Sequence, residues 1–174
     1  MEITVRKIRR EDVEVLSSMA KETFYDTFTG TCTEEDMQSF LEEYFNIPRM
    51  LAELNDPDGF NFFAEVDHVP AGYIQFKEDY SSFSEVKKWK AIELRRLYVQ
   101  KEFHGKGIAN TLMNLYLDHA VQHQYELAWL GVWEFNFRAQ KFYRKYGFED
   151  SGHGHPFPIG NTPQTDRWFW KFLK

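Results

Sequence analysis

The 174-residue sequence contains one cysteine, Cys32, and no apolar run that approaches the length of a membrane-spanning helix. A single cysteine excludes a disulfide within the chain and any zinc site built from several thiolates, and it is typical of a reducing compartment. The first residues mix charged and apolar side chains, which is not the pattern of a secretory signal. The sequence therefore predicts a cytoplasmic protein with no membrane partner.

Positive charge is also in short supply, because 21 Lys and Arg residues stand against 27 Asp and Glu, a net charge of -6. This balance argues against a nucleic-acid partner and favours a cationic one, although ordinary solubility would explain it equally well. Aromatic residues, by contrast, are abundant: there are 17 Phe, 9 Tyr and 5 Trp. That is more than a core of this size needs, so we expect some of them to line a pocket or an interface.

Segments with strand and helix patterns alternate along the chain, and 43% of its residues are hydrophobic, which is enough for a core. No repeat or linker divides the sequence, so we expect one α/β domain with a mixed sheet over residues 1–174. Two stretches, 79–90 and 152–163, are expected to be loops. The expected strands are 2–8, 60–66, 71–78, 92–99, 127–132 and 165–173, and the expected helices are 11–28, 34–44, one from 48, one from 108 and one capped by Asn136 with Phe135 on its apolar stripe.

The stretch 92–116 organises the rest of the chain, since a strand there runs through a tight loop into a helix. Gly105 and Gly107 let the backbone turn sharply and approach a ligand closely. The unpaired N–H groups and positive dipole end of the following helix favour a bound phosphate, although a strand-to-helix connection without a ligand has the same pattern. The loop lacks the Lys-Ser/Thr pair of an ATP-binding P-loop and the third glycine of the dinucleotide fingerprint.

Two motifs resemble those of the GNAT family of N-acetyltransferases. The loop His104-Gly105-Lys106-Gly107-Ile108-Ala109 is similar to the family's pyrophosphate loop, with His104 in place of the usual Arg or Gln. The pattern Asn136-x-x-Ala139-x-x-Phe142-Tyr143, followed by Gly147-Phe148, is similar to a second signature of the family. Within the family, the PaiA-type polyamine acetyltransferases are the most alike, over the stretches 22–28, 92–93, 130–134 and 164–166.

This resemblance implies a GNAT fold, with a mostly antiparallel central sheet of about seven strands that is splayed in the middle and flanked by helices. It implies acetyl-CoA as the donor and no metal. An extended amide-bearing arm needs a free strand edge, and a pyrophosphate needs N–H donors. The implied acetyl-CoA contacts are Leu97, Tyr98 and Val99 for the pantetheine arm, His104, Gly105, Lys106, Gly107, Ile108, Ala109 and Asn110 for the pyrophosphate, and Asn136 and Tyr143.

Two residues match catalytic positions of the family. Glu93 corresponds to a glutamate base, and its structural alternative is an ion pair with Arg95. Tyr143 corresponds to the tyrosine acid beside the CoA sulfur, and its alternative is core packing on the apolar face of its helix. A main-chain N–H near Tyr98 is expected to polarise the thioester carbonyl.

The sequence thus predicts direct acetyl transfer, within a ternary complex, to a primary amine such as spermidine or spermine. Candidate acceptor contacts are Tyr25, Phe28, Trp133 and Glu134, which combine aromatic rings with a carboxylate. The alternatives are a protein or peptide acetyltransferase and a non-catalytic acetyl-CoA-binding module, and a homodimer is compatible with the sequence. His119 and His123 have the spacing of a zinc-protease pair but lack its glutamate, so a solvated helix edge is the better interpretation.

Overall fold

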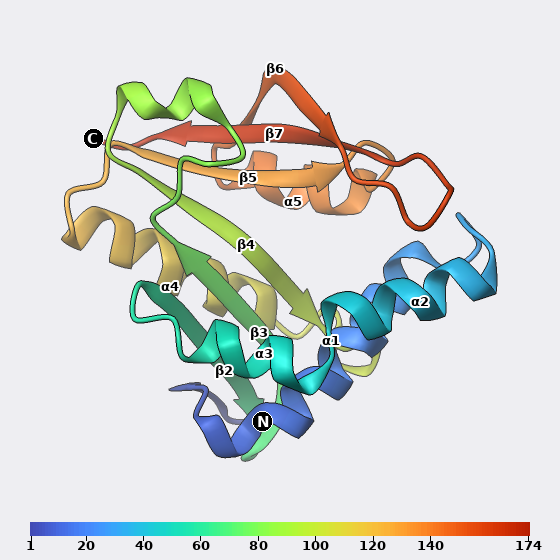
Figure 1. The fold of residues 1–174 in the computed structure, drawn as a ribbon. Helices are drawn as coiled ribbons and strands as arrows, with labels where there is room; N and C mark the ends of the chain where they lie inside the picture. The colour runs from blue at the N-terminus through green and yellow to red at the C-terminus, as the bar shows by residue number, and fades with distance from the viewer.

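One seven-stranded sheet runs through the computed structural model, which describes residues 1–174 (Figure 1). The strand order is β1-β2-β3-β4-β5-β7-β6, and every neighbouring pair is antiparallel except β4 with β5. The strands are β1 Ile3–Lys7, β2 Gly59–Val66, β3 Val69–Lys77, β4 Ala91–Val99, β5 Leu127–Trp133, β6 Glu149–Pro156 and β7 Thr165–Phe172. The predicted mixed, mostly antiparallel sheet is confirmed.

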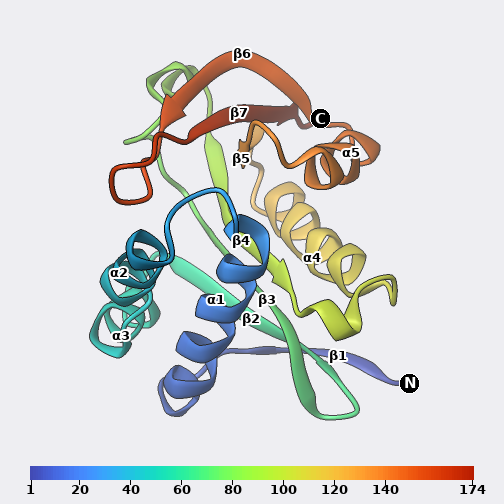
Figure 2. The ribbon, with the colours of Figure 1, turned by 90° about the vertical axis from the view of Figure 1, so that its right-hand side faces the viewer.

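Helices cover both faces of this sheet, with α1 to α3 on one side and α4 and α5 on the other (Figure 2). The alternation of β2 explains the arrangement: Phe63 packs among side chains of the first group and Ala64 among side chains of α4. No helix of the protein is long and apolar enough to cross a membrane. The helices are α1 Val13–Phe28, α2 Glu34–Tyr44, α3 Ile47–Leu54, α4 Ile108–Gln122 and α5 Phe137–Lys145.

Side-chain caps fix where α2 and α5 begin, and α3 is capped in the same way by Asn46. The Thr33 hydroxyl accepts a hydrogen bond from the Asp36 N–H at 3.1 Å, which starts α2. The Asn136 side chain accepts one from the Ala139 N–H at 3.1 Å, which starts α5. Both caps were expected, because Thr and Asn satisfy the otherwise unpaired N–H groups of a first helical turn.

The sheet is split in its middle by a bulge in β4. Gln75 of β3 pairs with Arg96 and Phe76 pairs with Leu94, so Arg95 is an extra residue without a partner on β3. On its other side β4 pairs with β5 only over residues 91–94 and 127–130. Beyond Leu94 the two strands diverge, as Figure 1 shows. The splayed centre expected from the family resemblance is therefore present.

Three local expectations were wrong. The stretch 79–90 contains a short 3-10 helix, Ser84–Lys88, and it buries Phe83 and Val86 against Trp129 and Trp168, because its few apolar residues all face the sheet. Residues 152–156 belong to β6, whose pairing with β7 outweighs the low strand propensity of Gly and Pro. Phe135 precedes α5 and is 58% exposed, since the cap at Asn136 starts the helix after it.

Candidate active site

The split between β4 and β5 opens into a cavity of about 1030 Å³. Its walls come from β4 beyond the bulge, the end of β5, the start of α5, the side of α1 and the loop before α4. Residues from distant parts of the sequence therefore meet where the two strands part. A cleft of this size between diverging strands is large enough for a drug-sized ligand.

One end of the cavity is the glycine loop. Gly105 and Gly107 have φ angles of 78° and 83°, in the left-handed region that favours glycine. A Cβ at either position would meet nothing within 4 Å, so the backbone angle rather than crowding explains these glycines. No side chain caps α4 at Gly107, and its first N–H groups remain available beside open space. These features fit a bound pyrophosphate.

His104 ties this loop to its surroundings. Its Nε2 lies 2.8 Å from the Val99 carbonyl oxygen, and its Nδ1 lies 2.9 Å from Nη1 of Arg138. A carbonyl only accepts, so Nε2 carries the proton and Nδ1 accepts from the guanidinium. The residue that departs from the family pattern thus connects the end of β4 to α5 and holds the Arg138 cation at the cavity wall.

A free strand edge runs along the cavity. Leu97, Tyr98 and Val99 pair with β3 on one side, through Ile74, Tyr73 and Gly72. On the other side they have no strand partner, because the pairing with β5 ends at Leu94. All three residues line the cavity. Such an edge can pair with the amide groups of an extended ligand.

Tyr143 of α5 lines the same cavity as Tyr98 and Asp166. Burial, then the neighbouring Tyr98 and Asp166, raises the pKa of its phenol well above the ordinary value. The hydroxyl makes no hydrogen bond within the chain, so it is protonated and available to a ligand at neutral pH. The side chain also packs against the core on the α4 face of the sheet, so the core packing considered as the alternative is present, and the acid role stays a prediction.

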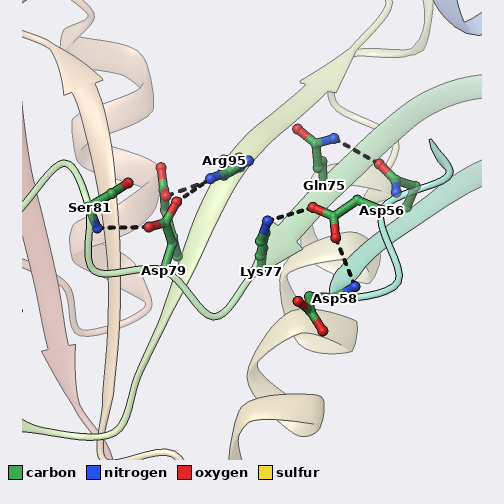
Figure 3. Close-up of polar contacts among 9 residues, drawn as sticks. Asp56, Asp58, Gln75, Lys77, Asp79, Ser81 and Arg95 are labelled. Atoms are coloured by element: carbon green, nitrogen blue, oxygen red, sulfur yellow. Dashed lines mark hydrogen bonds and ion pairs between the residues drawn. The ribbon is translucent and has the colours of Figure 1, made fainter. Parts of the chain in front are cut away.

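Glu93 lies one residue before the split, opposite Trp129 of β5. Burial raises the pKa of its carboxyl to about 7, against the opposing effect of Arg95. Its Oε2 is 3.3 Å from Nε of Arg95, so the ion pair considered as the structural alternative is present. Glu93 is not among the cavity-lining residues. Figure 3 shows that Arg95 also binds Asp79, which accepts from the Ser81 N–H at 2.8 Å.

A second carboxyl with a raised pKa is Asp166 on β7, which was not among the predicted site residues. It lines the cavity, and burial raises its pKa to about 7. It stands in the stretch 164–166 that resembles the PaiA-type enzymes, and it alternates with Trp168 and Trp170 on one face of β7. That alternation of an acid with two tryptophans was the available signal that the acid faces inward.

The expected acceptor contacts are only partly brought together. Phe28 and Trp133 line the cavity, with ring centroids 5.0 Å apart. Tyr25 does not line it, and its hydroxyl lies 3.3 Å from Oε2 of Glu34. Glu134 is also absent from the walls, whereas Asp26 is present.

Among the residues expected to contact acetyl-CoA, Lys106 alone lies outside the lining, with its Nζ 5.4 Å from the Phe103 ring centre.

The histidine pair of α4 is part of an aromatic cluster. The rings of His119 and His123 are 4.1 Å apart, and His119 packs 4.4 Å from Phe60 and 5.1 Å from Phe76. Burial lowers the pKa of His119, and so does His123. No group of three or more His, Cys, Asp or Glu residues is arranged to hold a metal ion.

Comparison with known proteins gives consistent matches. A model of the acetyltransferase (GNAT) family matches residues 19–148. An uncharacterized N-acetyltransferase from the pepI 3' region of Lactobacillus delbrueckii subsp. lactis is 30% identical over 164 residues, 94% of each chain. A spermidine N(1)-acetyltransferase of Thermoplasma acidophilum is 31% identical over 117 residues, 65% of this chain and 67% of that one. The crystal structure of the PaiA N-acetyltransferase of Thermoplasma acidophilum in complex with coenzyme A is similar with a TM-score of 0.81 and 25% identity, covering 99% of this chain and 100% of that one.

Proposed function

The chain belongs to the acetyltransferase (GNAT) family, as an acetyl-CoA-dependent N-acetyltransferase, and we propose that its acceptor is a polyamine or another small cationic primary amine. The observation that carries the proposal is the cavity in the split sheet. One end of it has N–H donors suited to a pyrophosphate, and the other has aromatic rings and carboxylates suited to a cation. Residues 1–174 would act as one domain, in the cytoplasm.

The proposed donor contacts use the backbone. The unpaired edge of Leu97, Tyr98 and Val99 would pair with the pantetheine arm, and the loop from Gly105 to Asn110 would hold the pyrophosphate. His104 and Asn136 would support this arrangement, the first through Arg138 and the second by starting α5. Because most of these contacts are main-chain N–H and C=O groups, His104 can replace Arg or Gln without removing the site.

Acetyl-CoA supplies an activated acetyl group, and the chain supplies the proton transfers. An amine reacts only after its ammonium has lost a proton, and the thiolate that leaves must gain one. We assign the first step to Glu93, acting through water, because its pKa of about 7 lets it accept a proton at neutral pH. We assign the second to Tyr143, whose hydroxyl is protonated and unpartnered. A backbone N–H near Tyr98 would stabilise the charge that develops on the carbonyl oxygen.

The cationic acceptor is supported by the far side of the cavity. Phe28, Trp133, Asp26 and Asp166 line it, and they provide the ring faces and negative charge that a polyamine needs. The net charge of -6 favours the approach of such a substrate. One relative bears the name spermidine N(1)-acetyltransferase, which points to the same chemical class.

A panel of amines tests the proposal. Release of the CoA thiol would be followed with spermidine, spermine, diamines, amino acids and short peptides, and Tyr143→Phe serves as a variant that keeps the ring but loses the acid. We expect spermidine or spermine to react best and the variant to be slow with every amine. Better rates with peptides would assign the acceptor to proteins. Binding of acetyl-CoA without thiol release from any amine would refute turnover altogether.

A further inference from the structure

Asp166 is a half-buried carboxylate that lines the cavity and has no partner in the chain. It accepts no hydrogen bond from any side chain, and it forms no ion pair. Several other carboxyls with little exposure lie beside an arginine: Glu65 beside Arg6, and Asp79 and Glu93 beside Arg95. Withdrawing an ionised carboxylate from water without a cation is unfavourable, so an unpaired carboxylate that lines a cavity is a candidate contact for a cationic ligand.

Gly131 of β5 makes room for this carboxylate. A Cβ at Gly131 would lie 3.1 Å from Oδ2 of Asp166 and 2.7 Å from the Trp168 ring. The side chain of Asp166 therefore extends from β7 over β5, toward the gap beside β4. Burial raises the pKa of Tyr98 to about 12, and the charge of Asp166 is the next cause. The charge of Asp166 also helps to raise the pKa of Tyr143. Asp166 thus lies near the hydroxyl assigned to protonate the leaving thiolate.

The groups around Asp166 leave no cation in the chain to satisfy it. Tyr98 faces it from β4 and Tyr143 from α5, and both are neutral phenols. His155 lies opposite Asp166 in the pairing of β6 with β7. Its ring stacks on Trp168 with the ring centroids 4.1 Å apart, and burial lowers the pKa of His155. Arg167, the residue after Asp166, forms an ion pair with Asp150 instead, with its Nη2 3.1 Å from Oδ1 of Asp150.

We propose that Asp166 binds the ammonium group of the acceptor and holds it at the reacting end of the cavity. This inference rests on the proposed function and assigns the substrate contact that decides it. The rings of Tyr98, Tyr143 and Trp133 line the same space and would offer their faces to the cation. Asp26 is a poorer candidate, because its side chain is 28% exposed and lies 3.9 Å from Lys101. Glu93 is paired with Arg95 outside the lining, where it can act on the bound amine only through water.

Binding of spermidine in the presence of CoA, which permits no transfer, tests this contact by calorimetry at pH 8. We expect Asp166→Asn to weaken spermidine binding about tenfold to a hundredfold, the range for losing a charged hydrogen-bond partner, and to leave CoA binding unchanged. Asp150→Asn is the matched control on β6, since it removes an aspartate paired outside the cavity. We expect it to bind spermidine within about twofold of the wild type.

The wild-type protein gives an independent readout. At pH 6 Asp166 carries a proton that must leave when the ammonium binds, so the measured heat should depend on the ionisation enthalpy of the buffer. At pH 8 this dependence should vanish, and in Asp166→Asn it should be smaller at pH 6. Wild-type affinity for spermidine in Asp166→Asn would overturn the inference. A wild type that binds spermidine but releases no thiol would instead refute the proposed turnover and leave this contact standing.

Discussion

Replacing Asp166 should stabilise the fold at alkaline pH even though it damages the site. Folding moves the pKa of this carboxyl from 3.8 to about 7 by burial. The folded state therefore binds the proton more tightly than the unfolded state, and the free energy of unfolding falls as pH rises from 4 to 7. Because each pKa unit corresponds to about 1.4 kcal/mol, the ionised carboxyl costs up to about 4 kcal/mol above pH 7. Solvent in the cavity reduces this cost, so we expect about 2 to 4 kcal/mol.

Urea unfolding between pH 5 and pH 8 measures this effect. We expect the free energy of unfolding of Asp166→Asn to exceed that of the wild type by a margin that grows with pH up to about 7. The control Asp150→Asn should be less stable than the wild type by a margin that stays constant over this range. Burial opposes ionisation of Asp150, but Arg167 and the Gly152 N–H lower its pKa below the ordinary value, so Asp150 is ionised in the folded and unfolded states above pH 5 and its contribution to stability does not change with pH. Parallel stability curves for Asp166→Asn and the wild type would refute the inference that Asp166 is buried without a partner.

Three further predictions concern catalysis and binding. Gly107→Val should weaken acetyl-CoA binding at least about tenfold, because valine disfavours a φ of 83° and its side chain would enter the open space beside the loop. Unchanged affinity in calorimetry would contradict this. Glu93→Gln should lower kcat about a hundredfold and shift the acid limb of the pH–rate profile. In the wild type this limb should lie near neutrality, because the pKa of Glu93 is about 7. Wild-type rates of the variant at pH 7 would show that Glu93 has only a structural role. The KM for spermidine should rise between low and high salt, and an amine of similar length with an uncharged tail should react poorly; equal rates and no salt effect would exclude a cationic acceptor.

Local signals in the sequence predicted much of this structure. The two glycines of the loop have positive φ angles, and the caps at Thr33 and Asn136 form as expected. Each of these features depends on residues within a few positions of one another. Hydrophobic periodicity likewise predicted most strands and helices, since one face of each is buried.

Three features of the site depend on distant parts of the chain, and the sequence did not reveal them. The extra residue Arg95 follows from the register between β3 and β4, which no single segment specifies. Burial of Asp166 depends on the missing side chain of Gly131, on another strand. Packing of α1 against the sheet sets the rotation of the helix about its axis. As a result Asp26 lines the cavity and Tyr25 does not.

The unpaired edge of β4 also bears on how this protein avoids self-association. Free N–H and C=O groups along a strand form a template on which the edge of another molecule can pair, a common start of aggregation. Here that edge lies inside the sheet, because β5 follows β4 in the strand order, and residues of α1 and α5 line the cavity beside it. A strand of another molecule would have to enter this cavity to pair with the edge. The position of the edge in the middle of the sheet thus keeps it away from the edge strands of other chains.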